Sequence, residues 1–164
     1  MSIRLIVKHP DNVLRERAQE VTKFNSNLHK LLDDMVDTMY EADGVGLAAP
    51  QVGILKRVIV VDCGDEHGGL IELVNPEFVN GEGEQFGPEG CLSIPGLQGD
   101  VRRYNKVVVK GQDRNGQPVQ YEGTELLARA FLHEIDHLNG VLFIDLAESV
   151  YEARKPSDEE EEGK

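Results

Sequence analysis

The stretch ELLARAFLHEIDHL, residues 125–138, predicts the helix that decides the fold. It contains no Gly or Pro; Thr124 and Glu125 favour a helix start, and Asn139-Gly140 is a typical helix end. Apolar residues occupy nearly every side of this helix: Leu126, Leu127, Ala130, Phe131, Leu132, Ile135 and Leu138. Because such a helix buries most of its faces, we expect it at the centre of a domain, surrounded by other elements.

Three polar residues interrupt this apolar helix in the pattern H-E-x-x-H. His133 and His137 are four positions apart and share one face, where both imidazoles can bind one metal ion. Glu134 follows the first histidine and can reach a water molecule activated by the metal, as a general base for hydrolysis. Two ordinary helix histidines are the alternative, but unpartnered polar groups are costly in so apolar a helix. The pattern therefore predicts a hydrolytic metal site.

A hydrolytic metal usually has three protein ligands, so one more is needed. The extended protease pattern H-E-x-x-H-x-x-G-x-x-H fails, because Phe143 occupies the place of its third histidine. Glu148 and Glu152 lie downstream, whereas Cys91 lies upstream next to a flexible glycine and offers a thiolate, a good ligand for divalent transition metals. The residues alone favour Cys91 and leave the two glutamates open. Cys63, within a β-type run, is interpreted as a small core residue.

The segment GVGLAAPQ, residues 44–51, is rich in small residues. Its glycines and alanines allow another part of the chain to approach the backbone closely. It is not a phosphate-binding loop, since neither G-K-[ST] nor a complete G-x-G-x-x-G is present. Gln51 is the one side chain in this segment that can donate a hydrogen bond to a developing oxyanion.

Outside these segments, apolar periodicity predicts a helix at residues 27–42 and a shorter one at 12–19. Runs rich in β-branched residues predict two hairpins, formed by strands at 57–63 and 70–74 and at 101–110 and 118–123, with the turn DRNG at 113–116. The glycine-rich section 81–99 predicts short strands and tight turns. Helices at both ends with strands between them indicate an α+β fold, in which small antiparallel or mixed sheets pack around the metal-binding helix.

Length and charge narrow the class of protein. The 164 residues correspond to one domain, and 17 Lys and Arg against 30 Asp and Glu give a net charge of −13. A chain this acidic is not expected to bind nucleic acid or an anionic membrane through its overall field. An acidic run begins at Asp158, and without residues 158–164 the net charge is −9. We expect one catalytic metallohydrolase domain at residues 1–150 and a disordered acidic tail at 151–164.

The N-terminus, the apolar windows and the cysteine count indicate the cellular compartment. The N-terminus has no signal-peptide pattern, and no window reaches the roughly 18 apolar residues of a membrane span. Two cysteines cannot form a disulfide scaffold. We therefore expect a cytoplasmic protein.

Together, three segments resemble the motifs of peptide deformylase: GVGLAAPQ at 44–51, EGCLS at 89–93 and HEIDH at 133–137. All three match in full and in the family's order, and the resemblance covers residues 3–150. It implies an enzyme that removes the formyl group from the N-terminal formyl-methionine of nascent polypeptides and releases formate. It also implies a deformylase-like α+β fold.

The resemblance implies a role for each matching residue. Cys91, His133 and His137 would bind one divalent metal ion, Fe²⁺ in most members, with Zn²⁺, Ni²⁺ or Co²⁺ as substitutes. Glu134 would activate water and later pass its proton to the leaving amine. Gln51 and the backbone N–H of Leu92 would hold the oxyanion, and Gly46 would contact the substrate through its backbone.

The side chain of the substrate's methionine needs an apolar pocket beside the metal. Leu126, Arg129 and Ala130 lie one or two turns before His133 on the helix, and Val45 is a further candidate. We expect the head of Arg129 in solvent at the pocket mouth, with an influence on substrate choice as the alternative. A second hypothesis concerns Glu89 and Arg103, which could form an ion pair that braces the loop of Cys91.

Two rival functions share the same histidines: a metallopeptidase, and a zinc-stabilised binding protein without catalysis. The small size and the failed third histidine disfavour the first. The intact Glu134 disfavours the second, as does the lack of a fourth ligand. The expected partners are formyl-methionyl nascent peptides. Because Arg154 and Lys155 are outnumbered by the acids that follow them, docking on the ribosome through a basic tail is not expected. We expect a monomer.

Overall fold

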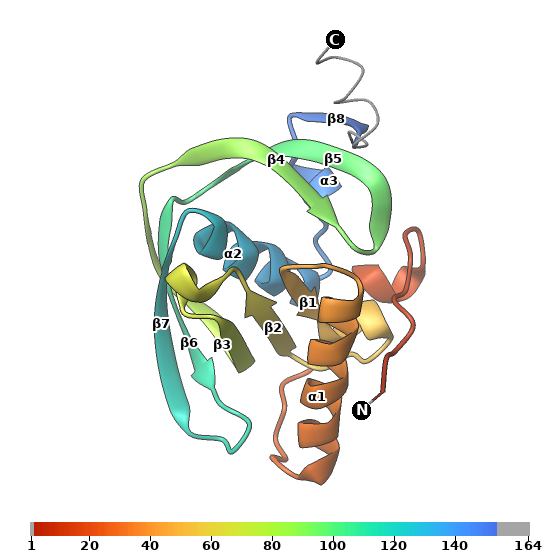
Figure 1. The fold of residues 1–164 in the computed structure, drawn as a ribbon, viewed down its shortest axis with the longest axis vertical. Helices are drawn as coiled ribbons and strands as arrows, with labels where there is room; N and C mark the ends of the chain where they lie inside the picture. The colour runs from red at the N-terminus through yellow and green to blue at the C-terminus, as the bar shows by residue number, and fades with distance from the viewer. Residues whose placement is uncertain (1, 154–164) are drawn as a thin grey trace.

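Helix α2 (Leu126–Leu138) lies at the centre of the computed structural model, which describes residues 2–153 (Figure 1). The predicted α+β fold is confirmed. The elements before α2 are η1 (Asn12–Arg15), α1 (Ser26–Glu41), β1 (Gly46–Ala48), η2 (Ala49–Val52), β2 (Val58–Asp62), η3 (Asp65–His67), β3 (Leu70–Glu82), β4 (Gln85–Cys91), β5 (Ile94–Arg103), β6 (Lys106–Gln112) and β7 (Pro118–Thr124). Those after it are α3 (Phe143–Leu146) and β8 (Ser149–Glu152).

An antiparallel sheet in the order β1-β2-β3-β6-β7 separates the two long helices. Its strand β2 is apolar at consecutive positions because both faces are covered. Ile59 and Val61 pack in one cluster with α2, whereas Val58 and Val60 pack in another with α1. The sheet therefore holds α2 on one face and α1 on the other.

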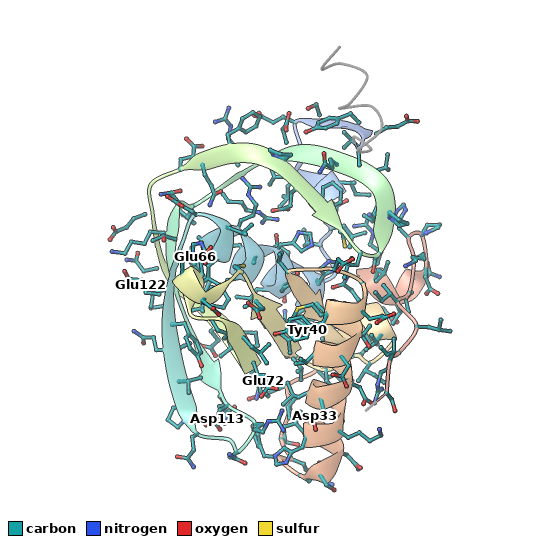
Figure 2. The ribbon with its side chains drawn as sticks, in the orientation of Figure 1. Asp33, Tyr40, Glu66, Glu72, Asp113 and Glu122 are labelled. Atoms are coloured by element: carbon teal, nitrogen blue, oxygen red, sulfur yellow. The ribbon has the colours of Figure 1, made fainter. Side chains whose placement is uncertain are left out.

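Helix α1 matches the predicted helix at 27–42 to within one residue at each end. Its N-cap is Asn25, whose side chain accepts a hydrogen bond from the backbone N–H of Leu28 at 3.1 Å. Figure 2 labels Asp33 on this helix and Glu72 on β3, and both receive hydrogen bonds from the guanidinium of Arg114. Arg114 stands in the predicted turn at 113–116, so this contact ties α1 to the β6–β7 hairpin.

A second antiparallel sheet, β4-β5-β8, arches over α2 (Figure 1). Ile94 and Val101 of β5 pack with Leu142 and Phe143 in a third apolar cluster, which joins this arch to the segment after α2. Strand β4 ends at Cys91, where the register with β5 shifts after Gly90. The arch therefore carries Cys91 toward α2.

Two strand predictions need correction. The β-type run 101–110 is split, because residues up to Arg103 belong to β5 and those from Lys106 belong to β6, in different sheets. The chain crosses between the sheets at Tyr104 and Asn105. The glycine-rich section 81–99 forms long strands rather than short ones: β4 has 7 residues and β5 has 10. The two predicted hairpins, β2–β3 and β6–β7, are confirmed.

Two helix predictions also differ from the structure. Thr124 does not cap α2: it ends β7, and Glu125 takes the N-cap position without a side-chain hydrogen bond. The backbone N–H of Glu125 instead donates to the carbonyl of Asn105, which holds Glu125 at a φ of 53°. The helix expected at 12–19 is only a 3₁₀ turn, η1, because Ala18 and Gln19 donate their backbone N–H groups to Leu138 and Leu55.

The end of the chain differs slightly from the expected boundary at residue 150. Strand β8 pairs with β5 through Glu152, so at least two residues of the expected tail belong to the arch. The remainder, 154–164, lies outside the described residues. In the described part of the chain, no helix has the length and apolar character needed to cross a membrane.

Candidate active site

The chain brings Cys91, His133 and His137 together although 42 residues separate the cysteine from the first histidine. Cys91 Sγ lies 3.3 Å from His137 Nε2, and the two Nε2 atoms are 3.2 Å apart. One ligand atom from each residue lies within 4.8 Å of the others. Glu148 and Glu152, the alternative third ligands, are exposed, and neither belongs to this group of ligand atoms.

The geometry fits a metal ion. A tetrahedral metal with ordinary Zn–N and Zn–S bond lengths holds its ligand atoms about 3.4 Å apart. The sulfur and the two ring nitrogens present lone pairs to one another at nearly this spacing, and a cation between them would satisfy all three. The mixture of thiolate and imidazole suits divalent transition metals rather than Mg²⁺ or Ca²⁺.

The two histidines experience different electrostatic surroundings. Burial lowers the pKa of His137 well below its usual value, which keeps its ring neutral, as a metal ligand must be. Burial acts in the same direction on His133, but the negative charges of Glu134, Cys91 and Glu89 outweigh it and raise the pKa. His133 Nδ1 lies 3.1 Å from Glu89 Oε2, so its Nε2 faces the metal position.

Glu134 is buried beside the three candidate ligands. Burial raises the pKa of its carboxyl group to about 7. Its Oε1 is buried and has no hydrogen-bond partner among the described residues. Its other oxygen lies over the backbone of Gly46, where a Cβ atom would stand 2.5 Å from it. The small-residue segment thus allows β1 to approach the carboxylate closely, as the sequence indicates.

Gln51 is fixed in orientation by its neighbours. Its Oε1 accepts the backbone N–H of Ala48 at 3.0 Å, so Nε2 points the other way. Nε2 donates to Ser93 Oγ at 3.1 Å and lies 3.5 Å from Cys91 Sγ. Ser93 was not singled out in the sequence, although it belongs to the EGCLS segment. Leu92 lies beside it in the turn between β4 and β5, packed against Gly44, where a Cβ would meet its side chain at 2.7 Å.

A cavity of about 330 Å³ opens at this cluster. The predicted pocket residues line it together with the catalytic candidates: Val45, Gly46, Gln51, Cys91, Leu92, Leu126, Arg129, Ala130, His133 and Glu134. A larger hollow of about 560 Å³ lies on the other face of α2, lined by Leu132, Ile135 and Asp136, and contains none of the three candidate ligands. We assign the chemistry to the smaller cavity, because among residues 2–153 this is where three metal-binding atoms meet a carboxylate oxygen without a hydrogen-bond partner.

Arg129 corrects one expectation. Its head was expected in solvent at the pocket mouth, but the residue is only 8% exposed. Its guanidinium turns into the protein and donates to Glu89 Oε1 and to the backbone carbonyl of Val101. Arg129 therefore lines the cavity with its charge paired to Glu89 and not held in solvent at the mouth.

The predicted ion pair between Glu89 and Arg103 is confirmed. Two nitrogens of Arg103 bond the two carboxylate oxygens at 3.2 and 2.7 Å, and both residues are buried. Asp136 joins the pair through Arg103 Nη1 at 2.6 Å. Asp136 occupies a variable position of the H-E-x-x-H pattern, so nothing in the pattern pointed to it. Cys63 is buried in the core, as expected.

Comparisons with known proteins agree with this arrangement. The family model described as polypeptide deformylase matches residues 3–152. A peptide deformylase of Alkaliphilus metalliredigens is 59% identical over 145 residues, which cover 88% of this chain and 97% of that protein. The crystal structure of a peptide deformylase from Legionella pneumophila superposes with a TM-score of 0.85 at 44% identity, covering 98% of this chain and 90% of the other. The structure from Thermotoga maritima has a TM-score of 0.86 at 43% identity, covering 91% and 100%.

Proposed function

The chain belongs to the polypeptide deformylase family and removes the formyl group from nascent polypeptides, and we propose that the cavity at Cys91, His133, Glu134 and His137 performs this hydrolysis. The observation that carries the proposal is the meeting of three metal-binding atoms with one buried, unpartnered carboxylate. Deformylase is a metal-dependent hydrolase, and in the described residues this is the one group of three such side chains close enough to share an ion.

Cys91 Sγ, His133 Nε2 and His137 Nε2 would hold one divalent metal ion, for which we propose Fe²⁺, with Zn²⁺, Ni²⁺ or Co²⁺ able to substitute. The bound ion supplies Lewis-acid chemistry: it polarises the formyl carbonyl and makes water easier to ionise. Cys91 and His133 line the cavity, so a formyl group in the cavity would have access to an ion held by these residues.

Glu134 acts as the general base and then as the general acid. Its carboxylate takes a proton from the attacking water while the oxygen bonds to the formyl carbon. It returns this proton to the amine nitrogen as the carbon–nitrogen bond breaks, so that formate and a free N-terminus leave. Burial raises the pKa of this carboxyl group, which makes the carboxylate a stronger base than an exposed one.

Gln51 Nε2 and the backbone N–H of Leu92 stabilise the oxyanion that forms when water attacks. Both lie next to Cys91. The side-chain oxygen of Gln51, Oε1, accepts a hydrogen bond from the backbone N–H of Ala48, so the amide does not need to reorient during the reaction. The backbone of Gly46 contacts the substrate from the opposite edge of the cavity.

Val45, Leu126 and Ala130, with the aliphatic part of Arg129, form the pocket for the methionine side chain. Their surfaces toward the cavity are apolar, as an unbranched thioether requires. The substrates we propose are formyl-methionyl nascent peptides, met in the cytoplasm as they leave the ribosome, and the enzyme works as a monomer. Its net charge of −13 opposes direct docking on ribosomal RNA.

Anaerobic purification followed by metal analysis and a formate-release assay on the same sample tests this function. We expect about one metal ion per chain, predominantly iron, and formate release from a formyl-Met peptide in proportion to metal content. A protein that binds no metal, or that cleaves internal bonds of an unblocked peptide without releasing formate, would overturn the proposal. Removing the metal with a chelator should abolish activity, and adding Ni²⁺ or Co²⁺ should restore it.

A further inference from the structure

A cluster of four charged side chains lies between the arch β4–β5 and helix α2, and two of its members, Glu89 and Arg129, line the metal-binding cavity. Glu89 is at its centre and accepts hydrogen bonds from Arg103 and Arg129, while Arg103 also pairs with Asp136. Two positive and two negative charges therefore balance. Glu89, Arg103 and Arg129 are all buried, where an unpaired charge would be costly.

Two arginines of this cluster join the arch to α2: Arg103, on β5, bonds Glu89 on β4 and Asp136 on α2, and Arg129, on α2, bonds both strands of the arch. From its position on α2, Nη1 donates to Glu89 Oε1 on β4 at 3.2 Å and Nη2 donates to the carbonyl of Val101 on β5 at 3.1 Å. Nε donates to Gln85 Oε1, also on β4, at 3.2 Å. One planar guanidinium with a fixed fork of donors thus ties three acceptors on two strands to the helix.

The tied elements are those that carry the metal ligands. Arg129 precedes His133 by one helical turn, and Glu89 precedes Cys91 by two residues on β4. Glu89 also faces His133 Nδ1 at 3.1 Å. Any shift of the arch relative to α2 changes the distance from Cys91 to the two histidines, and Arg129 spans this gap.

We propose that Arg129 is a positioning residue, which sets the separation between the strand pair that carries Cys91 and the helix that carries His133 and His137. It acts through Glu89 and through the Val101 carbonyl, not by contact with the metal or with the formyl group. The inference rests on the proposed function, in which these three residues hold the metal.

Two substitutions separate positioning from pocket lining. Arg129→Met keeps an unbranched side chain toward the cavity but removes all three hydrogen bonds. Arg129→Lys keeps the charge but has a single donor nitrogen in place of the three of the guanidinium, so it tests the positioning role if the Met variant does not fold. Arg102→Met is the matched control, because Arg102 is an exposed arginine of the same arch that pairs with Glu84 and Glu148.

The Co²⁺-substituted protein provides the measurements: its absorption spectrum, its Co²⁺ affinity by chelator competition, and kcat and KM for formate release. For Arg129→Met we expect an altered thiolate-to-metal band, a 10- to 100-fold loss of Co²⁺ affinity, and a kcat that falls more than KM rises. Arg129→Lys should give intermediate values, and Arg102→Met should match the wild type.

An unchanged spectrum and Co²⁺ affinity in both variants, with a change in stability alone or in KM alone, would overturn the positioning role and leave the proposed function intact. A wild-type protein that binds no Co²⁺ and releases no formate would instead overturn the proposed function, and the positioning role with it. The wild-type sample therefore separates the two failures.

Discussion

Gly46, on strand β1 of the five-stranded sheet, lies against the carboxylate of Glu134. The carboxylate lies so near the glycine backbone that an added Cβ would stand 2.5 Å from Oε2 and 3.0 Å from Cδ. Real Cβ atoms do not come this close to a carboxylate, so one of the two must move. Because position 46 has no side chain, the carboxylate of the general base Glu134 has room to lie where it does.

Gly46→Ala should lower kcat by about 10- to 100-fold, because a displacement of the base by about 1 Å carries that cost. The metal content should not change, since the three atoms nearest to the new methyl group all belong to Glu134 and none to a ligand residue. Steady-state formate release and metal analysis of the same preparation check the prediction.

Gly87→Ala is the matched control, because a Cβ at position 87 meets nothing closer than Arg129 Nη2 at 4.0 Å. It should retain nearly wild-type kcat. Equal kcat values for Gly46→Ala and the wild type would mean that Glu134 does not need its present position.

Helix α2 combines a structural and a catalytic face, and the two can be separated by substitution. Phe131 is fully buried against the five-stranded sheet, whereas Leu126 is 43% exposed at the cavity. Phe131→Ala should lower the free energy of unfolding by about 3 to 5 kcal/mol. Leu126→Ala should change stability by less than about 1 kcal/mol and should act on KM instead.

Urea denaturation and formate-release kinetics of both variants check this division. If Leu126→Ala proved as destabilising as Phe131→Ala, the cavity wall would also be part of the core. In that case a change in KM of Leu126→Ala would reflect the stability of the fold as well as the pocket.

The elements differ in how far they could be predicted. Helix α1 follows from apolar periodicity, and α2 follows from an apolar run without Gly or Pro that ends at Asn139-Gly140; both signals are local. The break at Tyr104 could not be predicted, because residues on both sides have the same β-type pattern and only the tertiary fold sends them into different sheets. The cap at Glu125 could not be predicted either, since its conformation depends on a hydrogen bond to Asn105.

The residues of the site also differ in whether the local sequence alone identifies them. The pattern H-E-x-x-H identifies His133, Glu134 and His137 because their spacing alone places the histidines on one helix face. The third ligand remained open between Cys91 and two glutamates until the family's motifs were considered. The burial of Arg129 could not be predicted, because its partner Glu89 lies 40 residues away in sequence.

At the scale of the whole molecule, the N-terminal segment is fastened to α1 by ionic contacts. Arg4 Nε and Nη2 lie 3.0 and 2.9 Å from Asp34 Oδ2, and Lys30 Nζ lies 3.3 Å from the same atom. Burial alone would raise the pKa of Asp34, but these two cations outweigh it and lower the pKa below its usual value.

A lowered pKa means that ionised Asp34 stabilises the fold above the unfolded-state pKa of about 3.9, and that this stabilisation is lost as the pH falls through the folded-state value. Asp34→Asn should therefore destabilise the protein by about 1 to 2 kcal/mol at pH 7. The difference from wild type should shrink below about pH 4. Urea denaturation at several pH values measures this difference. Glu41→Gln is the control, because Glu41 is an exposed acid of the same helix whose side chain makes no ion pair among the described residues. A difference that stays constant down to pH 3 would contradict the ionic account.

The end of the chain can be divided at β8. The family match ends at residue 152, and Ala153 donates its backbone N–H to Gly96. Truncation after Ala153 removes residues 154–164 and should leave formate release unchanged. Truncation after Glu148 also removes β8, exposes the edge of β5, and should lower the free energy of unfolding by about 1 to 3 kcal/mol. Thermal denaturation and activity of both truncations check this, and a loss of activity in the shorter deletion would assign a function to residues 154–164.

Glu134→Gln tests the central claim of the mechanism most directly, because it keeps the shape of the side chain and removes the group that carries the proton. Formate release from a formyl-Met peptide is measured for metal-loaded wild type and variant, with the metal content of each sample determined in parallel. We predict a fall in kcat of about 10²- to 10⁴-fold with one metal ion per chain retained. A variant that keeps its metal and releases formate at the wild-type rate would contradict the assignment of Glu134 as the general base.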